Sequence, residues 1–596
     1  MKRLKQSLIT VLVPLYILCF LWPSLSMASD KTYTRYTALL SNMKNQESVA
    51  NFIDEKNYLS DRLLKKWLAY LAKRKRWQDY LTYYQPTKNI TRQCHYLHAL
   101  HQANQSQTAL KHVKKIWLTG HKQPKACRYI FKKWQLSQYF NDDLLWQRIT
   151  LVMQAKQDTF VKQLMSNLPK RDQALISQWQ QLIKHPTRLN AHIFTKHPYT
   201  THIIVSVLKH LIYKDMKSAI MYWQKNETKY PFSYAQKQAI YQKLALYLAI
   251  RNKTNAEDYF AKLDPETTPD LYHEWRLRAA LKEHRWHDIN QIIKFLPTHL
   301  HNKPCWQYWY ARSFEKLGEH EKANALYALL SDKRHYYGFL ASHRGGFDMT
   351  MQQQKYLNQP ELLSPHKNQI NYINTLYKRQ RIDKASLLSY ELSNDLSKAA
   401  QYQLAKHYST WQWHDKALML ANLSQYKNDL FLRFPLAHAK LIEKYSIKYD
   451  VPEAFVYAII RQESTFRKKV KSSAGALGLM QVIPSTARKV SKQYHIPLRS
   501  MKHMYQAKTN INIGVAYLNH LSKRFDNHPI LMAAAYNAGP SQVSRWLKKS
   551  NKEETDLWIE TLPWHETRNY LKNVMSFYVV YQHRLNDTPS LEPFMK

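Results

Sequence analysis

A short run of residues near the C-terminus carries the side chain that acid–base chemistry needs. Glu463 follows Arg461 and Gln462 and precedes Ser464, at the end of a segment with helical periodicity. Burial against an apolar helix face and the negative end of a helix both disfavour a carboxylate, so both raise the pKa of such a group. A carboxyl group that stays protonated near neutral pH can protonate a glycosidic oxygen. Glu463 is therefore the candidate acid; the alternative is an exposed glutamate at a helix end, the commoner situation for this residue type.

The elements that must position Glu463 are a helix and a set of turns. Asp450 precedes a proline and a glutamate, which predicts an N-cap at Asp450, and Phe455, Ile459 and Phe466 recur at helical spacing and should face the core. Four of the nine glycines in the chain lie between residues 475 and 539. Glycine permits a positive φ or a close backbone approach, so we expect these four to shape the turns around Glu463.

Several motifs of this region resemble those of the soluble lytic transglycosylases, bacterial cell-wall enzymes with a goose-lysozyme-like catalytic domain. The motifs are residues 463–464 (ES), 478–481 (GLMQ) and 535–540 (AYNAGP). The resemblance continues through residues 510–514 and 560–570 and reaches upstream to residues 434–437. It thus covers roughly residues 434–585, in the order and at the spacing typical of the family.

The resemblance implies a reaction and a set of site residues. Glu463 would be the sole catalytic carboxyl group, first as acid and then as base, and would cleave the MurNAc-GlcNAc β-1,4 bond of peptidoglycan with formation of a 1,6-anhydromuramyl product. The residues implied to contact or position the sugar are Ser472, Gln481, Ile483, Tyr536, Asn537 and Glu566. Ile483 stands where the family often has methionine, which keeps an apolar wall. No cofactor is implied.

The number of catalytic carboxylates distinguishes a lytic transglycosylase from an ordinary glycoside hydrolase. Ordinary glycosidases use two, about 5–5.5 Å apart when the configuration is retained, whereas the next acidic residue after Glu463 is Asp526. Glu560 or Glu566 could still fold nearby, so a muramidase-type hydrolase stays open. A secreted helical-repeat adaptor that only binds glycan also stays open, although it would not need Glu463. A secreted nucleic-acid binder has no supporting motif.

The N-terminus predicts export to the periplasm. Lys2, Arg3 and Lys5 precede an uncharged stretch, residues 6–29, and small residues allow cleavage after Ala28. This pattern is typical of a signal peptide over residues 1–28, and its apolar core is too short for a spanning helix. The residues before Cys19 are not those of a lipoprotein signal. We expect no transmembrane segment after signal removal.

The net charge indicates which kind of polymer the protein binds, and the cysteines indicate a possible disulfide. A formal net charge of +46 attracts polyanions; export favours an acidic wall polymer over nucleic acid, while a generally basic proteome is the alternative. Cys94 and Cys127 could pair in an oxidising compartment, with Cys305 free, although buried free thiols are also common. The His-Glu pairs lack the second histidine of a zinc motif, so we expect no metal and no cofactor. We expect a monomer that acts on peptidoglycan glycan strands.

The rest of the chain predicts an all-α fold. Tyr241, Trp275 and Trp309 recur every 34 residues, as in stacked helix pairs, and we interpret these aromatics as core between repeats rather than as a ligand ladder. We expect a tetratricopeptide-like α-superhelical arm over residues 29–375, a small helical linker domain over 376–433 and a lysozyme-like transglycosylase domain over 434–596. The resemblance implies that such an arm closes into a ring. Since every motif follows residue 433, a fragment beginning near residue 430 should cleave short glycans.

Overall fold

The computed structural model describes residues 31–57, 59–191, 194, 197–548 and 554–595, and within them every regular element is a helix. The only β-type pairing in these residues consists of two isolated bridges, between Lys471 and Leu477 and between Leu477 and Val482. The all-α prediction is confirmed. The signal peptide predicted over residues 1–28 lies outside the described residues.

The described chain forms two compact units. Among the described residues, the first unit comprises residues 31–222 and 364–395, and the second comprises residues 223–363 and 396–595. The boundaries predicted near residues 375 and 433 are not the borders of these units, and they stay predictions.

The first unit is a succession of short helices. Its core contains the buried indoles of Trp67, Trp134 and Trp179. Cys94 and Cys127 are joined as a disulfide, with Cα atoms 4.9 Å apart, between α6 and η1. The helices of this unit are α2 (Lys31–Ser41), α3 (Gln46–Asp54), α4 (Ser60–Lys73), α5 (Trp77–Tyr83), α6 (Ile90–Gln102), α7 (Ser106–Lys111), α8 (Val113–Trp117), η1 (Lys125–Cys127), α9 (Arg128–Gln135), α10 (Asp142–Gln154), α11 (Asp158–Met165), α12 (Lys170–Lys184), η2 (Pro186–Ala191), α13 (Thr200–Lys214), α23 (Lys367–Lys378) and α24 (Ile382–Asp395). Two helices, α14 (Met216–Asn226) and η3 (Pro360–His366), contain the borders between the units.

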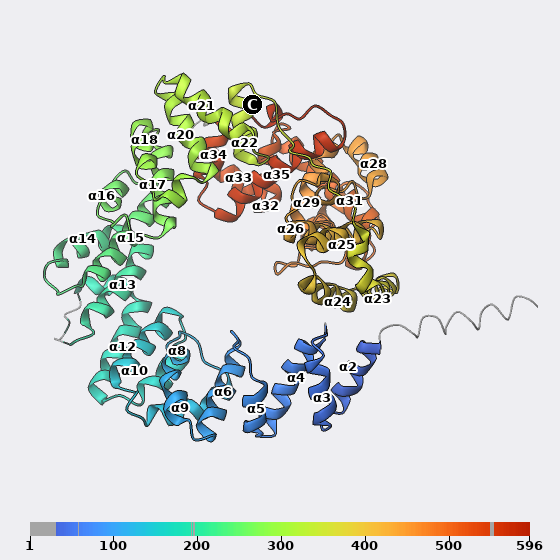
Figure 1. Ribbon diagram of the computed structural model, residues 1–596. Coiled ribbons are helices and arrows are strands. Elements are labelled where there is room, and N and C mark those ends of the chain that lie inside the picture. Colours follow the sequence, from blue (N-terminus) through green and yellow to red (C-terminus); the bar gives the residue numbers. More distant parts are fainter. Residues whose placement is uncertain (1–30, 58, 192–193, 195–196, 549–553, 596) are drawn as a thin grey trace, which may run out of the picture. The chain divides into compact units, whose positions relative to one another are not determined.

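The second unit begins with helices that pack against their neighbours in chain order, α15 with α17, α17 with α18, α18 with α20 and α20 with α21 (Figure 1). Tyr241, Trp275 and Trp309 lie on α15, α17 and α20 and are all buried, as expected for core between repeats. The helices of this part are α15 (Tyr234–Ile250), α16 (Ala256–Phe260), α17 (Asp270–Lys282), α18 (Trp286–Lys294), α19 (Thr298–His301), α20 (Pro304–Lys316), α21 (His320–Ser331), α22 (Tyr336–Gly345), α25 (Lys398–Thr410), α26 (His414–Leu423) and α27 (Leu430–Arg433).

The C-terminal part of the second unit carries the sequence motifs. One hydrophobic core runs from Leu277 on α17 to Phe594 near the C-terminus, so the repeat helices and the motif region share it. The helices of this part are α28 (Ala439–Tyr449), α29 (Glu453–Glu463), α30 (Pro484–Gln493), η4 (Met501–Tyr505), α31 (Ala507–Arg524), α32 (Pro529–Ala538), α33 (Pro540–Leu547), α34 (Thr555–Thr561), α35 (His565–Arg584) and α36 (Glu592–Met595).

Buried ion pairs join the repeat helices to α34. The carboxylate of Glu560, with only 1% of its side chain exposed, lies 3.1 Å from Arg278 on α17 and 2.7 Å from Lys572 on α35. Asp556, one turn earlier on α34, lies 3.3 Å from Arg312 on α20 and 3.1 Å from Arg344 on α22. Burial alone would raise the pKa of Glu560, but the charges of Lys572 and Arg278 hold it at about 2. These charges are therefore stable in the interior only because each has its partners.

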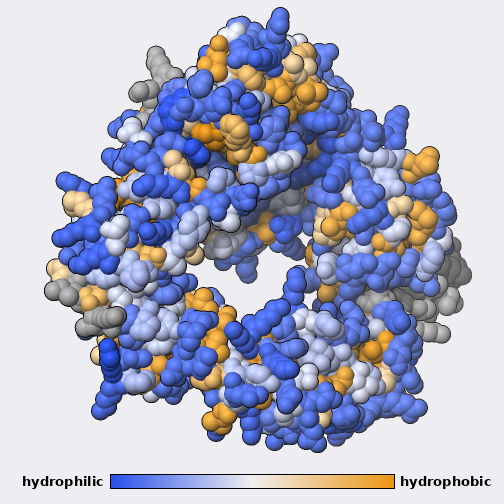
Figure 2. Space-filling model, turned by 60° about the vertical axis from the view of Figure 1, so that its left-hand side comes forward, coloured by the Kyte–Doolittle hydropathy of each residue, from blue (hydrophilic) through white to orange (hydrophobic). Residues whose placement is uncertain are grey.

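On the face seen in Figure 2, hydrophilic residues predominate and hydrophobic ones form small separate groups. Among the described helices, none combines the length and the apolar character that crossing a bilayer requires.

Candidate active site

Glu463 is the last residue of α29, and its helix begins differently from the sequence prediction. Asp450 adopts a left-handed conformation (φ 52°) and ends α28, so the predicted N-cap at Asp450 is wrong. Pro452 occupies the N-cap position instead, without a side-chain hydrogen bond. Phe455 and Ile459 are buried as expected, and they anchor the helix in the core of the second unit.

The carboxyl group of Glu463 is partly buried and accepts a hydrogen bond from the facing helix. The hydroxyl of Tyr570, on α35, donates a hydrogen bond to Oε1 at 2.7 Å. Burial raises the pKa of Glu463 to about 7; the Tyr570 hydrogen bond opposes the rise and the negative charge of Glu566 adds to it. A carboxyl group with a pKa near 7 is present in both protonation states near neutral pH. It can therefore donate a proton and later accept one.

The backbone turns sharply directly after Glu463. Thr465 and Phe466 both have positive φ values, 51° and 66°, although neither is glycine. Such conformations cost free energy and persist where the surrounding structure enforces them, often at functional sites. Phe466 is buried and Ser464 is almost fully buried, so this turn is fixed by packing.

The next motif forms a tight loop beside this turn. Gly478 has a φ of 74°, and a Cβ atom there would lie 2.2 Å from the backbone oxygen of Met504, so only glycine fits. Asn510 fixes the loop: its amide nitrogen donates to the carbonyls of Leu477 and Met504, and its oxygen accepts from the backbone nitrogen of Met480 at 2.8 Å. Asn510 lies in the segment 510–514 that resembles the family, but its residue type alone does not predict this role.

The loop also places three of the predicted site residues. Ser472 accepts a hydrogen bond from the backbone nitrogen of Ala476 at 3.0 Å, which closes a turn. Gln481 has a φ of 46° and donates its side-chain amide to the carbonyl of Gly478 at 2.7 Å. Ile483, directly before α30, keeps 43% of its surface exposed, so its apolar side chain is not covered by the core.

The remaining predicted residues come from α32 and α35. The hydroxyl of Tyr536 donates to the carbonyl of Met480 at 2.7 Å, and burial together with the charge of Glu463 raises its pKa well above the usual value. Asn537 accepts a hydrogen bond from the hydroxyl of Thr567 at 2.9 Å. Glu566 is exposed on the first turn of α35. Electrostatic interactions thus link Glu463 with Tyr536 and Glu566, and Tyr536 in turn contacts the loop that holds Gln481.

Tyr570, which contacts Glu463, is absent from the residues that the sequence predicts for the site. It lies in the segment 560–570 that resembles the family. Its position four residues after Glu566 puts both on one face of α35, and this spacing was the available signal.

The other carboxylate named in the sequence analysis lies elsewhere. Glu560 is bound by Arg278, Lys572 and the hydroxyl of Tyr337, so it is not available as a nucleophile beside Glu463. Within the described part of the chain, no three His, Cys, Asp or Glu side chains gather in a way that could hold a metal ion. The arrangement around Glu463 can perform proton transfer with a single carboxyl group.

The chain is similar to known proteins in sequence and in fold. Residues 440–559 match the family described as "Transglycosylase SLT domain", and residues 561–590 match "Soluble lytic transglycosylase helical domain". The chain is 28% identical over 575 residues to the soluble lytic murein transglycosylase of Salmonella typhimurium, across 94% of this chain and 88% of the relative. The structure of the lytic transglycosylase Slt of Pseudomonas aeruginosa, an inactive mutant, is similar with a TM-score of 0.89 at 28% identity, over 95% of this chain and 93% of that one. A complex of a 70-kDa soluble lytic transglycosylase with bulgecin A is similar with a TM-score of 0.82 at 26% identity, over 97% and 96% of the two chains.

Proposed function

We propose that this chain, which belongs to the soluble lytic transglycosylase family and is a lytic transglycosylase, cleaves the MurNAc-GlcNAc β-1,4 bond of peptidoglycan. The proposed product carries a 1,6-anhydromuramyl end. The observation that carries the proposal is Glu463, a partly buried carboxyl group with a pKa of about 7 inside the segment that matches the family. Its one hydrogen-bond donor, Tyr570, lies on the facing helix.

The proposed reaction begins with Glu463 as the acid. Its proton passes to the glycosidic oxygen as the bond from that oxygen to C1 of the muramyl residue breaks. The acetamido oxygen of the same sugar bonds to C1 and takes the place of an enzyme nucleophile, which fits a site where Glu560 is committed to ion pairs. The carboxylate of Glu463 remains, stabilised by the Tyr570 hydroxyl.

Glu463 then acts as the base. It removes the proton from the muramyl 6-hydroxyl, whose oxygen attacks C1 and displaces the acetamido oxygen. The 1,6-anhydro ring closes, Glu463 regains its proton and no water is consumed. Ser472, Gln481, Ile483, Tyr536, Asn537 and Glu566 are proposed to bind and position the sugars around this carboxyl group.

The product distinguishes this reaction from hydrolysis. Purified sacculi are digested with the full-length protein and the released muropeptides are analysed by mass spectrometry. Anhydromuramyl ends support the proposal, whereas reducing muramyl ends, heavier by one water, would identify a muramidase-type hydrolase. Glu463→Gln should lower the rate by about 10²–10⁴-fold for the loss of the acid alone. Retention of more than about a tenth of the activity would place the acid elsewhere.

We further propose that the protein acts as a monomer in the periplasm, on glycan strands rather than on nucleic acid. The basis for export to the periplasm is the pattern of Lys2, Arg3 and Lys5 before an uncharged stretch, residues 6–29. N-terminal sequencing of the exported protein should begin at Ser29, and light scattering should give a single-chain mass.

A further inference from the structure

A cavity of about 360 Å³ lies in the first unit, and basic, amide and aromatic side chains form most of its lining. These side chains come from α8, from η1 and α9, and from α10 and α11. None of the residues that line the cavity is acidic. Its volume falls in the range of pockets that enclose small ligands, so it offers space for an anion without a repelling carboxylate in its wall.

The floor of this cavity contains a buried arginine, Arg148, whose charge has no acidic partner. Only 1% of its surface is exposed, and its guanidinium group lies 4.5 Å from the ring centroid of Trp117 and 5.4 Å from that of Phe160. Its terminal nitrogens donate to the backbone carbonyls of Trp117 and His121, which satisfy N–H groups but do not neutralise a charge. Burial lowers the pKa of Arg148 to about 10, so the group stays protonated at neutral pH. Because charges in the interior are weakly screened, Arg148 attracts an anion in the cavity without touching it.

Four exposed cations surround the opening of the cavity: Lys122, Lys125, Arg128 and Lys132. Within the described ranges, none of them forms an ion pair with an acidic residue. Three of them are spaced three and four residues apart along η1 and α9, where like charges repel one another. Arg128 is also the first residue of α9, whose first turn contains no acidic residue, and the positive end of a helix disfavours a cation there. A bound anion would relieve both repulsions.

The disulfide of the first unit fixes these cations in place. Cys127 directly precedes Arg128 and is joined to Cys94 on α6, and both cysteines are fully buried. The backbone that carries Lys125 and Arg128 is therefore anchored on the core before any ligand arrives. Such preorganisation lowers the entropy cost of binding.

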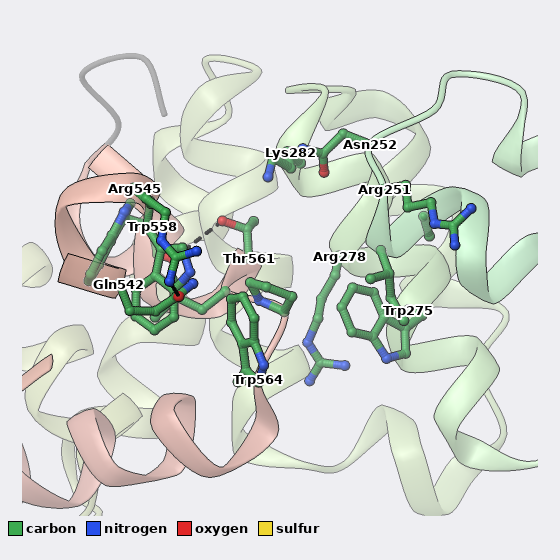
Figure 3. A pocket seen from close by; sticks show the side chains of 15 residues that line it. Arg251, Asn252, Trp275, Arg278, Lys282, Gln542, Arg545, Trp558, Thr561 and Trp564 are labelled. Carbon is green, nitrogen blue, oxygen red and sulfur yellow. Dashed lines mark hydrogen bonds between the residues drawn. The ribbon is translucent and has the colours of Figure 1, made fainter. Parts of the chain in front are cut away.

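A second cavity shows what distinguishes Arg148 from other buried arginines. This cavity, of about 520 Å³, lies in the second unit and is lined by Arg278 among others (Figure 3). Arg278 is matched by Glu274 at 3.3 Å and by Glu560 at 3.1 Å. In the first unit, an anionic ligand would supply the charge that these carboxylates supply in the second. In a chain with a net charge of +46, exposed lysines alone would not identify a site, but a buried, uncompensated arginine beneath them does.

We propose that this cavity of the first unit binds the phosphate group of a ligand, with Lys125, Arg128 and Lys132 as hydrogen-bond donors above the charge of Arg148. A phosphate monoester carries about −1.5 to −2 charges near neutral pH and three acceptor oxygens. A single phosphate group can therefore engage several converging cations, whereas a carboxylate offers one charge and two oxygens. The proposal does not depend on the proposed function, since it concerns binding to the first unit alone.

The test is isothermal titration calorimetry of the full-length protein with inorganic pyrophosphate. At 0.15 M NaCl, where the general attraction of a basic surface is screened over about 8 Å, pyrophosphate should bind to one site. Arg128→Ala should weaken this binding at least about tenfold, as expected for the loss of one charge-assisted hydrogen bond. Arg188→Ala removes an exposed arginine of η2 in the same unit, so it is the matched control and should leave the affinity unchanged. Both substituted positions are exposed, and equal Tm values of the three proteins confirm that the fold is intact.

A carboxylate ligand tests the chemistry. Citrate, a tricarboxylate, should bind at least about tenfold more weakly than pyrophosphate. The proposal is overturned if pyrophosphate does not bind, if Arg128→Ala and Arg188→Ala weaken its binding equally, or if citrate binds as tightly.

Two sources share the proposed chemistry, a soluble phosphorylated compound and a lipid with a terminal phosphate. Sedimentation with phosphatidylcholine vesicles that contain phosphatidic acid distinguishes them. Sedimentation that both pyrophosphate and Arg128→Ala reduce supports the lipid phosphate. Pyrophosphate binding without such sedimentation supports the soluble compound.

Discussion

The charge of Glu463 costs the folded state free energy, so its removal should stabilise the protein above neutral pH. The pKa of this carboxyl group rises from 4.5 to about 7 in the folded chain, chiefly because it is buried. At about 1.36 kcal/mol per pKa unit, this difference sets a ceiling of about 3 kcal/mol. The side chain is partly open to solvent, which screens its charge, so we expect about 1–2 kcal/mol.

The sign follows from the order of ionisation. Between pH 4.5 and about 7 the unfolded chain gives up this proton while the folded chain keeps it. The contribution of Glu463 to the free energy of unfolding therefore falls as pH rises through this window and is constant above it. Glu463→Gln removes this dependence and keeps the shape and the acceptor for the Tyr570 hydroxyl. The two proteins should be about equally stable at pH 5, and the variant should be more stable at pH 8.

Scanning calorimetry at pH 5, 6, 7 and 8 measures the effect. For a unit of a few hundred residues, about 1–2 kcal/mol corresponds to a difference of roughly 2–6 °C in Tm at pH 8. Glu321→Gln, at an exposed position of α21, is the matched control and should show no difference that grows with pH. If the gap between the Glu463 variant and the original protein does not widen from pH 5 to pH 8, the carboxyl group is not held at a raised pKa, and the acid–base argument fails.

Three changes to the chain have further expected outcomes. Tyr570→Phe removes the hydrogen bond that lowers the pKa of Glu463, so the alkaline limb of kcat/KM on a soluble glycan should move to higher pH; an unmoved limb would mean that Tyr570 does not control this ionisation. Replacing Cys94 and Cys127 together by alanine should destabilise the first unit by about 3–4 kcal/mol. Thiol labelling of the denatured, non-reduced protein should modify neither of them, and labelling of both would contradict the pairing. A fragment of residues 430–596 should be poorly folded by circular dichroism and inactive, because it lacks the residues of α17, α20 and α22 that share its hydrophobic core and pair with Glu560 and Asp556; a folded, active fragment would refute this.

The sequence was sufficient to predict the helical fold and the location of Glu463 at the end of a helix, because helix periodicity and glycine placement are local signals. It was misleading at Asp450, whose residue type suits an N-cap but which ends the preceding helix in a left-handed conformation. Aspartate is among the few residues that tolerate this conformation, so one residue type fits both roles. Only the path of the chain before residue 450 decides between them.

The sequence could not reveal the partners of the buried charges. Arg278 and Arg312 recur in phase with Trp275 and Trp309, and the repeat explains their spacing but not their charge. The structure pairs them with Glu560 and Asp556, which lie more than 240 residues away in the chain. Such pairs are long-range and have no local pattern. For this reason we do not expect the catalytic part to fold as a separate fragment, although the motif positions alone predict that it does.

These buried pairs bear on the catalytic carboxyl group through α35. Lys572 on this helix binds Glu560, which is also held by Arg278 of the repeat helices, and Tyr570, two residues earlier, binds Glu463. The same helix is thus tied at neighbouring positions to the repeat helices and to the candidate acid. A buried ion pair contributes little net stability compared with apolar packing, but it penalises any arrangement in which a partner is lost. Displacing α34 from α17 would leave Glu560 partly uncompensated, so the pairs favour one position of α35. Arg278, nearly 200 positions before Glu463 in the sequence, therefore helps to keep Tyr570 within hydrogen-bond distance of Glu463. The pKa of Glu463, on which the proposed chemistry depends, is sensitive to this hydrogen bond.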